Sequence, residues 1–424
     1  MSKTEFENEF FQTLKEELVP AAGCTEPISL AFAGAKAREL LGEIPEEITI
    51  RCSGNLIKNI RCVTVPNTGN LVGIEASILA GVVGGESDKG LEVITGINEE
   101  HLTLIHQLIA KKIVKIRLLD TPINLHYVLE CKTQEQSCEI EVKNLHTNIT
   151  RILLNGKTIL EKETANHAFF GVETDRSFLT IERILNFVNE VDITKLKPIL
   201  EPQVYYNMAI ANEGFKRNFS VSIGPTILKH DSSIYGKMKA YTASASEARM
   251  SGCAMAVITN SGSGNQGLTT SIPVILYAQH KDLAEDDMYR ALALSNLLTI
   301  YQKSFIGRLS AFCGAISAAV SSGAALTYIE GGSLEQIKMT IINALANVSG
   351  VVCDGAKPSC ASKITTGLEA AFLSHFLAMD NHSYNPFSGI LQKDADETIS
   401  AIGKMANQGM RETDKVILNI MIEK

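Results

Sequence analysis

The sequence predicts an α+β protein in which a mostly helical domain is joined to a smaller α+β domain with an antiparallel sheet. Two observations support this fold class. Residues 5–19 and most residues after 177 carry apolar side chains at helical spacing, whereas short segments between 48 and 160 alternate apolar and polar residues as strands do. A length of 424 residues is enough for two or three domains. We expect N-terminal helices in 1–47 that pack on the helical domain, the α+β domain in 48–175 and the helical domain in 176–424.

The N-terminal region predicts two helices. Phe10, Leu14 and Leu18 share one helical face, and Pro20 ends that helix because proline lacks a backbone N–H. The second helix is expected around Pro27, with Thr25 as its N-cap.

The middle region predicts six strands joined by turns. The strand segments are 48–52, 114–118, 125–131, 138–142, 149–154 and 158–160. Asn155 and Gly156 form the typical turn of a two-residue hairpin between the last two strands. The polar residues Asn55 and Lys58, taken alone, predict only a loop.

The remaining residues predict a series of helices with many small side chains. The first contains Leu179, Ile184 and Val188 on one face. The others are expected at 194–217, 240–257, 269–281, 284–302, 307–325, 334–349, 359–378, 392–408 and 412–422. Glycine and alanine allow close approach of such helices, and this favours a homodimer.

Composition and charge narrow the function classes. The hydrophobic share of 45% and the charged share of 20% are typical of a folded protein. The net charge of −8 argues against nucleic acids and anionic membranes as partners. The uncharged stretch 309–329 is rich in serine, glycine and alanine, which favours a buried helix over a membrane span. The first ten residues contain no apolar run, so we expect a cytoplasmic protein with reduced cysteines.

Three of the nine cysteines are candidates for a metal centre. Cys353 lies in a turn-rich loop, Cys360 starts the next predicted helix, and Cys313 lies near the start of the uncharged helix. Thiolates are ligands for soft metals and iron–sulfur clusters. Three thiolates leave one iron of a cluster open, and such an iron can act as a Lewis acid. Buried structural thiols are the alternative interpretation.

Other polar residues are candidates for binding and catalysis. Cys24 precedes the second predicted helix, where a thiol is either reactive or a filler of a tight cap. The glycine-rich segment 261–267 opens a helix and suits a carboxylate or phosphate, with a flexible turn as the alternative. It is not a P-loop, since it lacks Gly-Lys-Ser/Thr. His146 is a general base if it faces a cleft and otherwise an ordinary surface or buried histidine.

Eight motifs in order resemble the L-cysteine desulfidases, iron–sulfur enzymes related to the α chain of bacterial iron–sulfur L-serine dehydratases. They lie at 19–31, 55–59, 63–69, 146–149, 246–250, 260–267, 308–313 and 348–356. The resemblance covers the chain from about Val19 to Lys415. Any one motif would be weak evidence, but their shared order is specific.

The resemblance implies a function for the helical domain. Cys313, Cys353 and Cys360 would hold a [4Fe–4S] cluster with one open iron, and the reaction would be β-elimination of L-cysteine to pyruvate, ammonia and hydrogen sulfide without pyridoxal phosphate. Cys24 would be a base, a ligand or a sulfur carrier, and His146 a second catalytic residue. Substrate binding would involve Asn55, Lys58, Ser261, Ser263, Gly264 and Asn265.

Three other functions remain open from the residues. An L-serine dehydratase would use the same cluster. Two departures from that enzyme favour the desulfidase: only His146, Thr147 and Asn148 represent its Ser-Ser-His-Thr segment, and the C-terminus carries no cysteine. A pyridoxal phosphate lyase would need a Schiff-base lysine, and an iron–sulfur redox sensor would need an output module.

Overall fold

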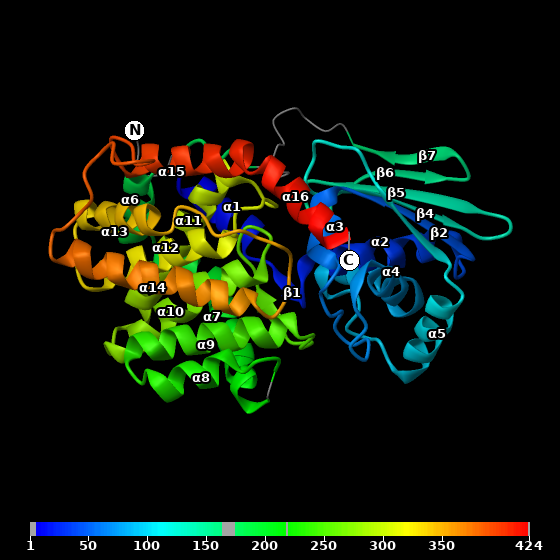
Figure 1. Ribbon diagram of the computed structural model, residues 1–424, viewed down its shortest axis with the longest axis horizontal. Helices are drawn as coiled ribbons and strands as arrows, with labels where there is room; N and C mark the ends of the chain where they lie inside the picture. Colours follow the sequence, from blue (N-terminus) through cyan, green and yellow to red (C-terminus); the bar gives the residue numbers. More distant parts are fainter. Residues whose placement is uncertain (1–5, 163–173, 218, 423–424) are drawn as a thin grey trace.

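The computed structural model describes residues 6–162, 174–217 and 219–422. Two parts lie side by side, a bundle of helices and a sheet backed by helices (Figure 1). The C-terminal helix α16 (Arg411–Ile422) leaves the bundle and packs against α3 (Gly54–Ile60) of the sheet-containing part. The α+β class predicted from the sequence is therefore confirmed. The end of the predicted α+β segment, residues 163–173, lies outside the described residues.

The sheet confirms the predicted strands and adds one parallel pair. Its strand order is β3-β2-β4-β5-β6-β7. The bounds are β2 (Glu47–Cys52), β3 (Val114–Leu118), β4 (His126–Lys132), β5 (Ser137–Lys143), β6 (Ile149–Leu154) and β7 (Lys157–Glu161). Asn155 and Gly156 have φ of 50° and 76°, as their tight hairpin requires. The sheet is mixed and not wholly antiparallel, because a helical crossover between β2 and β3 makes that pair parallel.

Helices cover one face of the sheet. They are α2 (Thr25–Leu41), α3, α4 (Gly73–Gly84), α5 (Glu99–Ala110) and a short 3-10 helix (Ser87–Glu92). The α2 helix contacts α4, β4 and β5, and its apolar side chains belong to the core of the sheet. The second N-terminal helix thus packs on the sheet and not on the helical domain, where both N-terminal helices were expected, whereas α1 (Glu7–Glu17) packs in the bundle. The exact domain boundaries stay a prediction.

The close contact between α2 and α4 gives a stability prediction. A Cβ on Gly81 would lie 1.9 Å from the backbone oxygen of Ala31, so no side-chain movement can make room for it. We expect Gly81→Ala to lower the free energy of unfolding by at least ~2 kcal/mol in urea titrations. Gly409→Ala is the control, because its Cβ would have no neighbour closer than 3.9 Å. Equal stability of the two variants would contradict this packing.

The bundle contains the remaining helices and a two-stranded sheet. The helices are α1, α6 (Ile181–Glu190), α7 (Ile193–Lys216), α8 (Ile223–His230), α9 (Ile234–Met250), α10 (Gly264–His280), α11 (Glu285–Ile306), α12 (Gly314–Ile329), α13 (Leu334–Asn347), α14 (Cys360–Met379) and α15 (Ala395–Lys404), the last followed by a π-helical turn (Met405–Gly409). The strands β1 (Pro20–Ala22) and β8 (Ala256–Ile258) pair antiparallel. The predicted helices are present with shifted ends, and α8 was not predicted.

The uncharged stretch 309–329 forms the centre of the bundle. Its helix α12 contacts α10, α11, α13 and α14, and its alanine, glycine and serine side chains are buried between them. The helix begins at Gly314 and not at 307, so the preceding residues form a loop that ends at Cys313. Within the described ranges, no helix is long and apolar enough to cross a membrane.

Candidate active site

A cavity of about 90 Å³ lies where the bundle meets the sheet-containing part. Four cysteines from segments far apart in the sequence line it: Cys24, Cys313, Cys353 and Cys360. The other lining residues are Glu26, Asn59, Arg249, Met250, Gly262, Ser263, Asn265, Gln266, Lys303, Arg308, Leu309, Ser310, Phe312, Gly314, Ala315, Gly355 and Ala356. The fold therefore brings together the cysteines that the sequence singled out.

Two neighbouring loops hold the first two cysteines of the bundle. The backbone N–H of Cys313 donates to Val351 O at 2.8 Å, and that of Cys353 donates to Ala311 O at 2.6 Å. Cys360 is the first residue of α14, and its N–H donates to Lys357 O. Backbone hydrogen bonds thus fix the relative positions of the three residues.

The three thiols are close enough to influence each other's ionisation. Burial, together with the neighbouring sulfurs of Cys353 and Cys360, raises the pKa of Cys313 to about 12. Burial also raises the pKa of Cys360. Ionising these thiols together therefore requires a cation among them, and a bound metal supplies such a charge.

Cys24 and Glu26 form a hydrogen-bonded pair. They lie near the N-terminus of the chain, far in sequence from these three thiols. The Cys24 thiol donates to Glu26 Oε2 at 3.1 Å, and Asn59 Nδ2 donates to Oε1 at 3.0 Å. Burial and the Glu26 charge raise the pKa of Cys24 well above its usual value. Burial alone would raise the pKa of Glu26, but His146, the Cys24 hydrogen bond and Arg249 outweigh it and lower that pKa. The pair thus rests as a thiol beside a carboxylate.

The expected cap of α2 is one residue off. Cys24, and not Thr25, is the N-cap residue. Thr25 is already helical, and its hydroxyl donates to Gly262 O at 2.9 Å, which links α2 to the glycine-rich segment. This contact crosses between the two parts of the molecule and defines one edge of the cavity.

Four helices begin at the cavity. Their N-cap residues are Cys24 for α2, Ser263 for α10, Cys313 for α12 and Ser359 for α14. None of these four side chains caps its own helix; the N-cap residues of α1, α3, α4, α8 and α11 do not either, whereas Asn98, Thr180, Asp192, Ser233, Ser333 and Asp394 cap theirs. Uncapped helix N-termini present N–H donors and a partial positive charge, so the cavity suits an anionic occupant.

Three cationic side chains add to this positive character. Arg308 Nη2 donates to both carboxylate oxygens of Glu17 at 3.0 Å. Arg249 Nη1 donates to Asn265 Oδ1, while its Nε has no partner among the described residues. Lys303 is only 4% exposed, and burial lowers its pKa to about 8 although the Cys353 and Cys313 sulfurs oppose this.

His146 lies beside the cavity and does not line it. Its ring faces Gly262, where an added Cβ would lie 3.3 Å from His146 Cε1. Burial lowers the pKa of His146 to about 4, so its imidazole is neutral at pH 7. Its Nε2 has no hydrogen-bond partner among the described residues. The predicted general base is therefore next to Glu26 but behind the glycine-rich segment.

The glycine-rich segment contributes only some of its predicted residues. Ser263 and Asn265 line the cavity. Ser261 instead lines a smaller neighbouring cavity of about 20 Å³. Gly264 lies against the Arg249 guanidinium, where an added Cβ would lie 2.4 Å from Nε. Glycine at this position therefore lets Arg249 reach the cavity wall.

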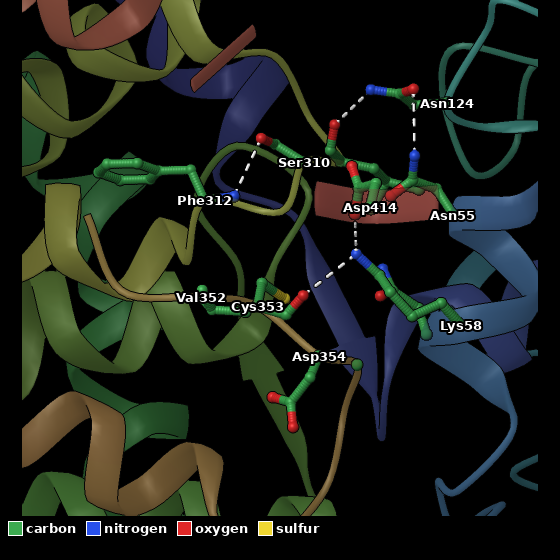
Figure 2. A network of polar contacts seen from close by, with 12 residues as sticks. Asn55, Lys58, Asn124, Ser310, Phe312, Val352, Cys353, Asp354 and Asp414 are labelled. Atoms are coloured by element: carbon green, nitrogen blue, oxygen red, sulfur yellow. Dashed lines mark hydrogen bonds and ion pairs between the residues drawn. The ribbon is translucent and has the colours of Figure 1, made fainter. Parts of the chain in front are cut away.

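Asn55 and Lys58 do not line the cavity but support it from the α3 side. Asn55 donates to Asn124 Oδ1 (Figure 2). Asn124 in turn donates to Leu309 O. The ammonium of Lys58 donates to Cys353 O at 3.2 Å and pairs with Asp414 of α16 (Figure 2). Lys58, which belongs to the sheet-containing part, thus connects α16 and the bundle loop that carries Cys353.

Breaking the buried pair is expected to destabilise the protein. Asp414→Asn would leave the ammonium of Lys58, which is 1% exposed, without a counter-charge. We expect a loss of about 3–5 kcal/mol in the free energy of unfolding, measured by urea titration. Lys415→Met removes an exposed ion pair with Glu412 on the same helix and should leave stability unchanged. A loss for Asp414→Asn no larger than for this control would contradict the role of the pair.

Several residues of the cavity were not predicted as functional. Glu26, Arg249, Gln266 and Arg308 lie within the motifs quoted above. Lys303 lies in a helical segment outside those motifs, where a lysine looks like an ordinary surface residue. Its burial depends on helices that meet only in the folded chain.

The donor set contains the thiols that an iron–sulfur cluster takes as ligands. Across the described ranges, no group of three or more His, Cys, Asp and Glu side chains is arranged to hold one ion. All three bundle cysteines that line the cavity are free thiols. Unpartnered buried atoms, including Gln266 Oε1 and Asn59 Oδ1, leave polar groups for an occupant.

The fold and the site define a protein in which a helical bundle and a sheet-containing part share one cavity lined by thiols. Comparison with known proteins identifies its relatives. The model of the family "Serine dehydratase alpha chain" matches residues 88–419. The chain belongs to this family, which confirms the relation predicted from the motifs.

Relatives from several bacteria match the chain along its length. A "UPF0597 protein" from Treponema denticola is 46% identical over 420 residues, covering 98% of this chain and 97% of that protein. Another from Lachnoclostridium phytofermentans is 47% identical over 414 residues, covering 96% and 98%. A third from Phocaeicola vulgatus is 36% identical over 419 residues, covering 97% and 96%. L-Cysteine as substrate stays a prediction.

Proposed function

We propose that this protein is a [4Fe–4S] lyase that converts L-cysteine and water to pyruvate, ammonia and hydrogen sulfide without pyridoxal phosphate. The observation that carries the proposal is the meeting of Cys313, Cys353 and Cys360 with Cys24 in one cavity. Family membership supports a dehydratase-type elimination, since β-elimination of a thiol and of a hydroxyl share the same first steps.

The three bundle cysteines would hold the cluster. When bound, it would supply a Lewis acid that assists departure of the β-substituent. The rest of the site would bind the amino acid substrate. The uncapped starts of α10 and α12 offer N–H donors to a carboxylate, and Ser263 and Asn265 border the same space.

The Cys24–Glu26 pair would handle the protons. Elimination removes the Cα proton and expels the β-sulfur, which forms 2-aminoacrylate, and hydrolysis of its imine tautomer gives pyruvate and ammonia. Glu26 is the resident base, because it is ionised and already accepts a hydrogen bond from Cys24. A proton taken at the Cys24 sulfur can pass to Glu26, and the Cys24 thiol can return one to carbon.

Asn59 and Thr25 would keep the carboxylate of Glu26 in place for this step. Asn59 Nδ2 donates to it at 3.0 Å, and the Thr25 hydroxyl, which can donate to either Gly262 O or Glu26, lies 3.1 Å from Glu26 Oε2. His146 would act as a positioning residue for Glu26. Its neutral ring lies behind Gly262, close to the charges of Glu26, Arg308 and Arg249. The pair is thereby held between the two parts, where Cys24 is 4% and Glu26 8% exposed.

An L-serine dehydratase with the same cluster is the second candidate, and the name of the matching family favours it. Pyruvate and ammonia would form from either substrate, so sulfide release alone identifies the desulfidase. A redox sensor would retain the cluster and turn over neither amino acid. The free state of all nine cysteines fits a reducing cytoplasm, and we expect a homodimer that binds no nucleic acid or membrane.

The test is anaerobic reconstitution with iron and sulfide. The expected results are a broad visible absorption from the cluster, about four irons per chain, and sulfide release from L-cysteine faster than ammonia release from L-serine. Faster turnover of L-serine would identify the dehydratase. Iron uptake without turnover of either amino acid would favour the redox sensor. Visible absorption by an internal aldimine after addition of pyridoxal phosphate would point to a pyridoxal phosphate lyase.

A further inference from the structure

The cavity contains a buried cation without a partner. Lys303 of α11 is 4% exposed, and its ammonium makes no hydrogen bond or ion pair with any residue that the structure describes. A buried ammonium without a hydrogen-bonded counter-ion is unfavourable, because the Cys353, Cys313 and Glu17 charges offset its lost hydration only in part. Lys303 therefore indicates an anion that occupies the cavity.

The protein offers Lys303 no carboxylate of its own. Glu17 lines the smaller cavity beside Lys303, but Arg308 donates to both of its oxygens and Arg176 donates to one of them. Glu26, on the other wall, already accepts from Cys24 and Asn59. The two acidic side chains that border this space are thus committed to other donors.

The surroundings of Lys303 favour a small carboxylate. Lys303 borders the cavity together with the uncapped starts of α10 and α12, whose N–H donors and positive ends attract the same charge. The cavity of about 90 Å³ has room for a compact ligand only. An ammonium on a flexible stem can adjust to one carboxylate oxygen while backbone N–H groups bind the other.

We propose that Lys303 recognises the α-carboxylate of the substrate and so makes the site specific for amino acids over their amides and amines. This proposal rests on the function proposed above, because it names the group that selects the substrate class. It also adds a charged group to the glycine-rich segment, which the sequence predicted to suit a carboxylate. The α10 start supplies N–H donors, and Lys303 supplies the charge.

Binding to cluster-free protein tests this role without any activity measurement. The probes are pyruvate, which has a carboxylate, and pyruvamide, which is its neutral counterpart, both titrated by calorimetry. In Lys303→Met we expect the affinity for pyruvate to fall at least tenfold and the affinity for pyruvamide to stay the same. Lys404→Met, an exposed lysine on α15, is the control for loss of one positive charge and should change neither affinity.

Two further measurements separate ligand binding from other roles of Lys303. The ligand-free Lys303→Met protein should melt at the same or a higher temperature, because the variant no longer buries an unpaired ammonium. Its iron content after reconstitution should equal that of the wild type. An unchanged pyruvate affinity would overturn the proposal, and so would a loss of iron, which would assign the charge of Lys303 to the thiolates.

The same variant distinguishes failure of this proposal from failure of the proposed function. If the reconstituted wild type turns over neither amino acid, the lyase assignment fails, while the pyruvate titration still decides whether Lys303 binds a carboxylate. If the wild type is active, Lys303→Met should raise KM for L-cysteine at least tenfold and leave KM for L-cysteinamide unchanged. Equal KM values for L-cysteine in both proteins would overturn the role of Lys303 alone.

Discussion

Replacing Cys313, Cys353 or Cys360 by alanine is expected to leave a folded protein that no longer retains iron after anaerobic reconstitution. Each residue supplies one of the three thiols that the bundle contributes to the cavity, so removal of one leaves two of these ligands for a cluster that needs at least three. Iron per chain and the visible absorption of the cluster should both fall to background. Activity should be lost with them.

Cysteines of the sheet provide the matched control for this experiment. Cys52, Cys131 and Cys138 are buried in the core of the sheet, away from the cavity. Alanine at these positions should keep full iron content and lower stability by about 1 kcal/mol, as expected for loss of a small buried group. Normal iron content in all three bundle variants would show that these thiols are structural.

Cys24→Ala and Glu26→Gln are expected to lower kcat about 10²–10⁴-fold while sparing most of the bound iron. Cys24 and Glu26 form one hydrogen-bonded pair, so each variant interrupts the same proton path. Their effects should therefore not add in the double variant, because the path is already broken by either change. Turnover of L-cysteine and iron content are measured on the same reconstituted samples.

Cys24→Ser is the conservative comparison. A hydroxyl can keep the hydrogen bond to Glu26, but it is a much weaker acid than a thiol, so the variant should fold normally and remain slow. Loss of iron in Cys24→Ala would make Cys24 a ligand and not an acid–base group. Full activity of Glu26→Gln would remove Glu26 from the mechanism.

The strands were predictable because each has a local signature. Alternation at 138–142 and the Asn155-Gly156 turn depend only on neighbours in the sequence, and both are present in the structure. The parallel pairing of β2 with β3 was not predictable in the same way, because strand order depends on where the helical crossover leaves the chain. The α3 helix was missed because seven residues are too few to show helical spacing.

The thiol residues of the site were predictable, but their neighbours were not. Cysteines are rare enough to be noticed in the sequence, and the motifs around them pointed to a family. Glu26 and Lys303 look like ordinary charged residues, and only the fold shows that both are buried on one cavity. Lys58 was expected at the substrate, but its buried pair with Asp414 depends on a helix more than 350 residues away in the sequence, which gives it a supporting position.

The four uncapped helix starts around the cavity have a consequence for the protein before it is loaded. Their positive ends point toward a common space and repel one another, and their first N–H groups lack side-chain acceptors. The first turns of α2, α10, α12 and α14 should therefore exchange amide hydrogens readily in cluster-free protein and slow markedly on loading, while the capped starts of α13 and α15 should not change. Loading of the cavity with the anion would then resemble a local folding step, in which the first turns of these helices become ordered. Through mass action, binding would also raise the melting temperature of the whole chain.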